Sequence, residues 1–254
     1  MIVELIGTPG SGKTTLASRI VDTLVARGVV ATSADDARTV VADQVARGRW
    51  AVTRRASPGL WATSLRLRLM TRGVDEQVPL HQLRRCDAAL RAARPDGVVV
   101  LHEGSFHRLC IILARAGRID DRTVDRFVGH MARPDALVHL RFPSYAVHAR
   151  ARGRLVGLGY ESELAEVENE AWRAWRTAYQ AAADRVAGTV GCELPVLRVE
   201  DTEADVGSLS ESVGGWIEAM IGADGVRPPA GVSSPRCATT TSTRYARKNG
   251  IRDP

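Results

Sequence analysis

The sequence has few of the features that mark membrane, secreted or disulfide-stabilised proteins. No apolar run approaches the ~18 residues that a membrane-spanning helix needs. The first ten residues, MIVELIGTPG, lack the basic segment and the cleavage site of a secretory signal. Cysteine is scarce and no CxxC pair occurs, the four being Cys86, Cys110, Cys192 and Cys237. We therefore expect a cytoplasmic protein with reduced thiols and no membrane partner.

Lysine is nearly absent, although the chain is basic. Of the 35 Lys and Arg residues only two are lysines, Lys13 and Lys248, and the formal net charge is +6. Residues 222–254 hold six basic and two acidic residues, which leaves 1–221 close to neutral. Because the excess charge lies mainly at the C-terminal end, the composition does not favour a nucleic-acid partner.

The remaining composition and its periodicity predict an α/β fold. Hydrophobic residues make up 44% and charged residues 25% of the 254 residues, as in ordinary globular proteins. Short apolar runs alternate with helical periodicity, which indicates a parallel sheet covered on both faces. We expect strands at 2–6, 29–33, 98–101, 136–140 and 195–199, and helices at 13–27, within 37–94 (broken near 57–58 and 73–79), and at 105–116, 121–132, 162–187 and 204–221. Residues 1–221 form the predicted domain, and 222–254, rich in Pro, Gly, Ser and Thr, form a predicted disordered basic tail.

The strongest motif follows the first predicted strand. Residues 7–14, Gly7-Thr8-Pro9-Gly10-Ser11-Gly12-Lys13-Thr14, match the phosphate-binding pattern G-x-x-x-x-G-K-[ST] at every fixed position. Glycines let successive backbone N–H groups point at phosphate oxygens, and the next helix adds its positive N-terminal end. Lys13 supplies a cation to the phosphates and the Thr14 hydroxyl ligates Mg²⁺. Together with the neighbouring Thr15, these residues form the predicted ATP site.

Acidic residues follow the second and third predicted strands. Ligands of open α/β sheets lie beyond the carboxyl ends of the strands, where Asp35, Asp36 and Glu103 are expected. Glu103 could hold Mg²⁺ or accept a proton. Asp36 could contact a phosphoryl acceptor or cap the following helix, and Asp35 could simply be exposed. His102 and His107 lack metal spacing and are expected to be structural.

The phosphate loop, with Glu103 after an apolar strand, resembles the P-loop kinases, in particular the nucleoside and nucleotide kinases that include thymidylate and deoxynucleoside kinases. The resemblance implies a three-layer P-loop NTPase fold with a five-stranded parallel sheet in the order 2-3-1-4-5. It also implies ATP and Mg²⁺ as cofactors and a small-molecule acceptor. One departure is His102, which stands where many P-loop proteins have Asp.

The same resemblance suggests residues further along the chain. Residues 148–160 resemble an R-x-x-x-R lid in which Arg150 and Arg154 stabilise the transferring phosphoryl group. In this arginine-rich chain they could instead form a solvated basic helix face. Asp201 follows the fifth strand, where related kinases contact adenine, and Arg108 lies where they place an acceptor-binding arginine.

The sequence thus favours a phosphotransferase that uses ATP and Mg²⁺, with Lys13, Glu103, Asp36, Arg150 and Arg154 as catalytic candidates. The favoured acceptor is a nucleoside or nucleoside monophosphate, and a sugar or antibiotic hydroxyl is the alternative. A nucleotide-binding switch or accessory ATPase is a second class of function, although the guanine-reading N-K-x-D motif is absent. The sequence leaves a homodimer open.

Overall fold

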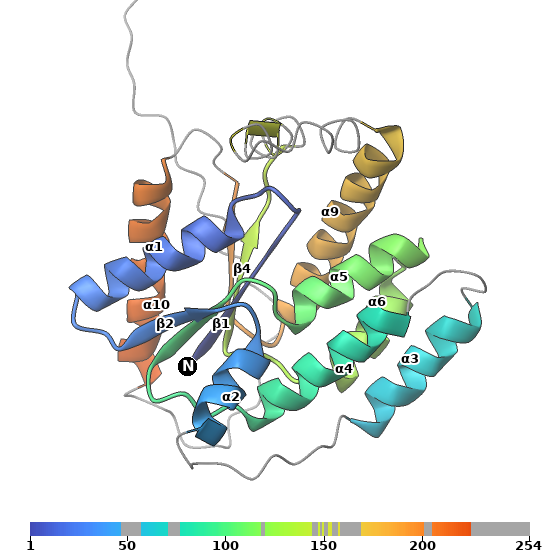
Figure 1. The fold of residues 1–254 in the computed structure, drawn as a ribbon, viewed down its shortest axis with the longest axis horizontal. Coiled ribbons are helices and arrows are strands. Elements are labelled where there is room, and N and C mark those ends of the chain that lie inside the picture. The colour runs from blue at the N-terminus through green and yellow to red at the C-terminus, as the bar shows by residue number, and fades with distance from the viewer. Residues whose placement is uncertain are drawn as a thin grey trace, which may run out of the picture.

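The computed structural model describes residues 1–46, 57–70, 77–117, 120–143, 147, 149, 152–153, 157, 169–200 and 205–224. Its core is a five-stranded parallel sheet in the order β2-β3-β1-β4-β5 (Figure 1). The strands are β1 (Ile2–Gly7), β2 (Ala31–Ala34), β3 (Val98–Leu101), β4 (Ala136–Leu140) and β5 (Val196–Val199). The predicted fold class and strand order are therefore confirmed.

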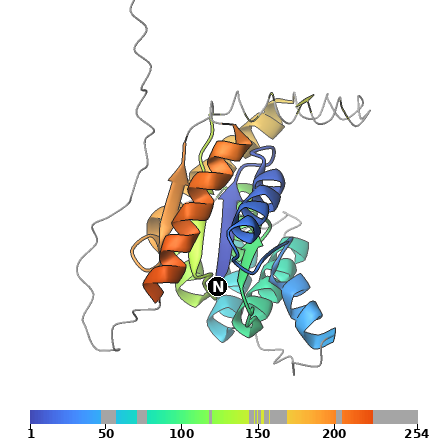
Figure 2. The same ribbon diagram turned by 90° about the vertical axis from the view of Figure 1, so that its left-hand side faces the viewer.

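Helices cover both faces of this sheet. On one face α1 (Lys13–Ala26) packs beside α10 (Val206–Asp224), as Figure 2 shows. On the other face α5 (Ser105–Ala116) packs against α9 (Glu170–Val190). The remaining helices are α2 (Ala37–Ala46), α3 (Pro58–Met70), α4 (Gln77–Ala92) and α6 (Asp121–His130). In the described part of the chain, no helix is both long enough and apolar enough to cross a bilayer.

The alternation of side chains along β1 divides the core. Val3 and Leu5 join the cluster under α1 and α10, whereas Ile6 joins the cluster under α5 and α9. Because both faces of the sheet are covered, even the apolar strands β3 and β4 are buried along their whole length.

Most predicted boundaries agree with the structure to within a few residues. The second strand begins at Ala31 instead of Val29, because Gly28 (φ 84°) ends α1 and the Val29 N–H still bonds to the Leu24 carbonyl. The last helix continues to Asp224, beyond the predicted 221. Helix α9 begins at Glu170, where the Asn169 side chain accepts from the Ala171 N–H, and 158–168 lie outside the described residues.

One residue of the central strand is charged. Glu4 is 0% exposed, and its carboxylate accepts hydrogen bonds from the His107 N–H at 2.8 Å and the Ser105 hydroxyl at 3.4 Å. The first turn of α5 is capped in this way from the sheet, because its own N-cap residue, Gly104, has no side chain to do so. A Cβ on Gly104 would lie 2.3–2.7 Å from the Glu4 carboxyl atoms, so only glycine lets the two elements approach. Burial raises the pKa of Glu4 from 4.5 to about 7, although the hydrogen bonds oppose the shift.

The raised pKa predicts a pH-dependent stability that a Glu4→Gln variant should lack. The folded chain holds a proton on Glu4 up to about pH 7, whereas the unfolded chain releases it near 4.5. Stability from this group is therefore complete below pH 4.5 and is lost as pH rises through 7, by ~3 kcal/mol in all. Urea unfolding at pH 5 and pH 8 should show this loss in the wild type relative to Glu4→Gln. An equal pH dependence in both proteins would contradict the assignment.

Candidate nucleotide-binding site

The loop between β1 and α1 has the backbone geometry of an anion cradle. Gly10 (φ 88°) and Gly12 (φ 84°) adopt the left-handed conformation that side chains disfavour. The Ser11 N–H bonds to the Thr8 carbonyl at 3.0 Å and tightens the turn. Gly12 caps α1 without any side-chain hydrogen bond, so the first N–H groups of this helix are available to a ligand.

The loop also packs tightly and holds polar atoms without partners. A Cβ on Gly7 would lie 2.9 Å from both Leu140 and the Ser11 hydroxyl, which leaves no space for a side chain. The Thr8 and Ser11 hydroxyl oxygens are buried and have no hydrogen-bond partner among the residues that the structure describes. Such groups are costly unless a ligand or water satisfies them.

Lys13 is a buried cation held by backbone oxygens. It is 8% exposed, and its Nζ donates to the carbonyls of Gly7 at 2.7 Å and Thr8 at 3.3 Å. Burial lowers its pKa to about 8, although the negative charge of Glu103 opposes the shift. Among the described residues, no carboxylate forms an ion pair with it. A phosphate group placed in the loop would supply the missing negative charge.

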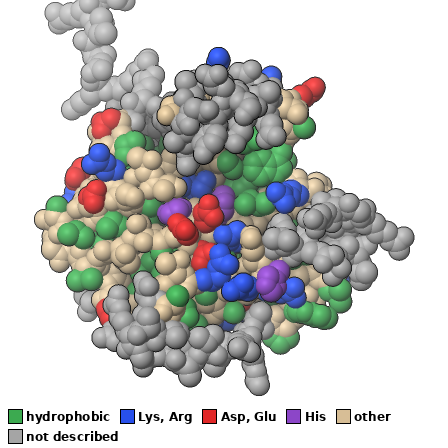
Figure 3. Space-filling view, viewed as in Figure 1, with side chains coloured by type: hydrophobic (Ala, Val, Ile, Leu, Met, Phe, Trp, Pro, Cys, Tyr) green, Lys and Arg blue, Asp and Glu red, His purple; other side chains and the backbone are tan. Residues whose placement is uncertain are grey.

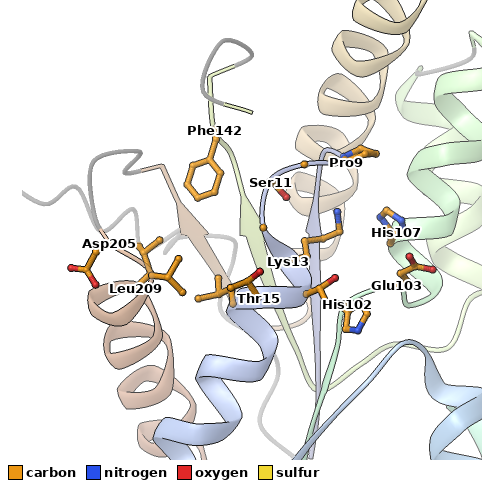
Figure 4. Close-up of a pocket in the computed structure, with 15 residues that line it drawn as sticks. Pro9, Ser11, Lys13, Thr15, His102, Glu103, His107, Phe142, Asp205 and Leu209 are labelled. Carbon is orange, nitrogen blue, oxygen red and sulfur yellow. The ribbon is translucent and has the colours of Figure 1, made fainter. Parts of the chain in front are cut away.

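These groups line one pocket of about 630 Å³. Figure 4 shows Glu103 and His107 together on one side of the Lys13 side chain, and Phe142, Asp205 and Leu209 on its other side. The pocket is lined by residues from the loop and from five other elements or their ends: Pro9, Gly10, Ser11, Gly12, Lys13, Thr14, Thr15, Leu16, His102, Glu103, His107, Phe142, Asp205, Val206 and Leu209. The volume suits a nucleotide-sized ligand.

The residues in the pocket fit a magnesium ion. The exposed Thr14 hydroxyl and the half-exposed Glu103 carboxylate both line it. Oxygen ligands are those that Mg²⁺ prefers, and one or two protein ligands suffice when phosphates and water supply the others. Among the described residues no three His, Cys, Asp or Glu side chains form a metal-binding group.

The ends of β2 and β3 bring the predicted acidic residues together. The Glu103 N–H bonds to the Asp35 carbonyl at 2.7 Å, and His102 Nε2 lies 3.2 Å from the Asp35 carboxylate. Arg108 joins the two functional candidates, since its Nη2 lies 3.3 Å from Glu103 and 3.6 Å from Asp36. Figure 3 shows acidic, basic and histidine side chains gathered near the centre of one face of the molecule.

The three carboxylates nevertheless differ in environment. Glu103 is 49% exposed at the pocket, and Asp35 is exposed. Asp36 is 2% exposed, caps α2 through the Arg38 N–H at 2.7 Å, and pairs with the Arg38 guanidinium. Burial raises the pKa of Asp36, but Arg38 and Arg108 outweigh burial and lower it. Asp36 is therefore a helix cap, and its predicted contact with an acceptor stays a prediction.

The other predicted site residues have mixed outcomes. Arg150, Arg154 and Asp201 lie outside the described residues, as does most of the predicted lid. Cys86 and Cys110 are buried, and among the described cysteines none forms a disulfide. On α9, Tyr179 is buried in the core, whereas Trp172 and Trp175 are only half-buried.

Sequence reasoning did not place His107, Phe142 or Asp205 in the pocket. For His107 the available signal was its position four residues after Glu103, because α5 starts between the two. Phe142 and Asp205 reach the pocket from segments that follow β4 and β5, and no local pattern marks them.

Comparisons with known proteins give a likeness to solved structures only. No protein-family model matches the sequence, and no curated protein matches it. The chain is similar to deoxyadenosine kinase from M. mycoides in two structures, one with bound dCTP and one with bound dATP. They have TM-scores of 0.49 and 0.46 and 14% identity, and they cover 86% of this chain and 100% and 99% of those chains. Because so few residues are identical, the function is inferred below from the site itself.

Because Lys13 is a buried cation, we expect removal of its charge to stabilise the fold and to weaken nucleotide binding. At pH 7 the folded chain keeps this lysine charged at a cost, since its pKa has fallen from 10.5 to about 8. Lys13→Met keeps the apolar stem and removes the charge. We expect the free energy of unfolding at pH 7 to rise by ~1–3 kcal/mol and the gain to shrink as pH rises from 8 to 10.5.

Urea unfolding at pH 7 and pH 10 measures this difference, and thermal unfolding with ADP measures binding. ADP should raise the Tm of the wild type and leave that of Lys13→Met unchanged. A less stable variant at pH 7, or an equal rise in Tm with ADP, would contradict the role assigned to Lys13.

Proposed function

We propose that this chain is a phosphotransferase that uses ATP and Mg²⁺ to phosphorylate a small molecule, with a nucleoside or nucleoside monophosphate as the favoured acceptor. The observation that carries the proposal is one pocket in which the phosphate loop and Lys13 face a carboxylate from the neighbouring strand end, Glu103. A phosphate loop alone suits any NTP-binding protein, whereas the opposed carboxylate suits transfer to a hydroxyl or phosphate acceptor.

The loop would bind and orient the triphosphate. Backbone N–H groups of residues 10–14 and the ammonium of Lys13 would contact its oxygens and stabilise the charge that spreads over them during transfer. Thr14 and Glu103 would hold Mg²⁺, which would supply neutralisation of phosphate charge when bound.

Glu103 and Arg108 would act on the acceptor side. Glu103 is exposed enough to meet a hydroxyl and can accept its proton. The guanidinium of Arg108 lies against both Glu103 and Asp36, so it can also meet the negative charge of an acceptor phosphate. Arg150 and Arg154 complete the proposal as lid cations, and Asp201 as an adenine contact.

Glu103→Gln tests the proposal most directly. The variant keeps the shape of the side chain and removes its charge, so we expect turnover to fall ~100-fold with the fold intact. ADP release and transfer of ³²P from γ-labelled ATP would be measured with Mg²⁺ and a panel of nucleosides, nucleoside monophosphates, sugars and aminoglycosides.

Glu218→Gln is the matched control, because that carboxylate pairs with Arg27 at the C-terminal end of α1, whereas the pocket lies at the N-terminal end of this helix. If no acceptor raises ATP consumption above hydrolysis and Glu103→Gln changes nothing, the kinase proposal is wrong. A nucleotide-dependent switch or accessory ATPase would then be favoured.

Asp36→Asn should act through Arg108. Both Asp36 oxygens already accept hydrogen bonds from Arg38. Loss of the Asp36 charge would therefore weaken its contacts with Arg38 and Arg108 and leave Glu103 in place. We expect the KM for the acceptor to rise several-fold with kcat little changed. Steady-state kinetics with varied acceptor measure both constants. A fall in kcat as large as that of Glu103→Gln would instead make Asp36 the base.

A further inference from the structure

His107 lies in the pocket without a part in the chemistry described so far. It is the third residue of α5, is 5% exposed, and lines the pocket with Lys13 and Glu103. Figure 4 shows its ring on the Glu103 side of Lys13, where the terminal phosphoryl group of a bound triphosphate would face the acceptor. Its backbone N–H is bonded to Glu4, which fixes the first turn of the helix.

One ring nitrogen is held from behind by a buried tyrosine. His107 Nδ1 lies 2.5 Å from the Tyr179 hydroxyl, and the two rings are tilted by 53°. Tyr179 is fully buried, and burial raises its pKa well above its ordinary value, so the phenol keeps its proton. The same phenol is also hydrogen-bonded to the Gly7 backbone and to the Cys110 side chain. Burial raises the pKa of Cys110 as well, so its thiol keeps a proton that it can donate to the phenol oxygen. We therefore assign the phenol proton to the hydrogen bond with Nδ1, which places the imidazole proton on Nε2.

The second nitrogen is left for a ligand. In the described part of the chain no group forms a hydrogen bond with Nε2. Burial and the positive charges of Lys13, Arg108 and His102 lower the pKa of His107 well below 6.5. The ring is thus a neutral N–H donor beside a cation, and this combination suits an anionic oxygen.

We propose that the Nε2–H of His107 donates a hydrogen bond to the terminal phosphoryl group of the triphosphate, and that Tyr179 is a positioning residue that fixes this donor. This inference rests on the function proposed above. The neutral ring of His107 would add a hydrogen bond to the phosphoryl group that Lys13 also binds. It would do so without placing a second positive charge beside Lys13, which has no ion-pair partner among the described residues. A purely structural histidine would instead leave binding of the terminal phosphate unchanged when replaced.

The first test compares two nucleotides. His107→Phe keeps a ring and removes the donor, and His107→Gln restores an N–H donor. We expect His107→Phe to weaken binding of AMP-PNP ~10-fold and to leave ADP within ~2-fold, with part of the loss recovered in His107→Gln. His81→Phe is the matched control, because His81 is exposed on α4. The affinities of AMP-PNP and ADP would be measured by calorimetric titration of each protein with each nucleotide in the presence of Mg²⁺.

The second test reads the proton directly in the wild type. Long-range ¹H–¹⁵N spectra separate protonated from unprotonated imidazole nitrogens, and His107→Gln assigns the signals. We expect a protonated Nε2 that shifts on addition of AMP-PNP and far less on addition of ADP. In Tyr179→Phe both tautomers should appear. This measurement keeps the proposal testable even if His107→Phe fails to fold.

The outcomes distinguish the two proposals. If the wild type binds both nucleotides and His107→Phe lowers both affinities equally or neither, only the role of His107 is overturned. A proton on Nδ1 in the wild type would also overturn it. If the wild type binds neither nucleotide, the proposed function itself is wrong.

Discussion

The carboxylate of Glu4 holds the first turn of α5 against the central strand, and the position of the pocket wall that carries Glu103 and His107 depends on this contact. The hydrogen bond from the His107 N–H and the close approach of Gly104 fix where the chain leaves β3 and enters the helix. Glu103 precedes that junction and His107 follows it. A shift of the helix by one residue would turn His107 away from the pocket, because neighbouring positions on a helix point about 100° apart.

The pocket also concentrates polar groups that cost stability. Lys13 is a buried cation without an ion-pair partner among the described residues, and the Thr8 and Ser11 hydroxyls are buried without hydrogen bonds. Arg108 also has a buried nitrogen without a partner. Polar groups of this kind are rare in protein interiors and gather where a ligand is bound.

The parts of the structure that follow from local rules could be predicted from the sequence. Gly10 and Gly12 require the left-handed backbone, and the apolar runs of β1, β3 and β4 require burial on both faces, so the loop and sheet were accessible to sequence reasoning. The meeting of Asp36 and Glu103 followed from the rule that parallel strands end at one edge of the sheet. The strand order came from the resemblance to P-loop kinases.

Contacts between distant segments could not be predicted in this way. Tyr179 lies 72 positions from His107, and nothing in either neighbourhood shows that they touch. Glu4 occurs in an apolar run, and the alternation along the strand predicts which face of the sheet its side chain lies on. It does not predict that the carboxylate contacts the first turn of α5. The same limit applies to Asp36, whose capping of α2 was an open alternative until the Arg38 contact was known.

The opposite shifts of Glu4 and Lys13 have a consequence for the lifetime of the protein. Glu4 becomes charged above about pH 7 and Lys13 stays charged below about pH 8, so near neutrality the ligand-free fold carries both buried charges. A phosphate-bearing molecule bound only by the folded state adds stability in proportion to the logarithm of its concentration. Proteases act on transiently opened chains. Degradation of the protein would therefore slow when such a molecule is plentiful and quicken when it runs short, so that its abundance follows the supply of what it binds.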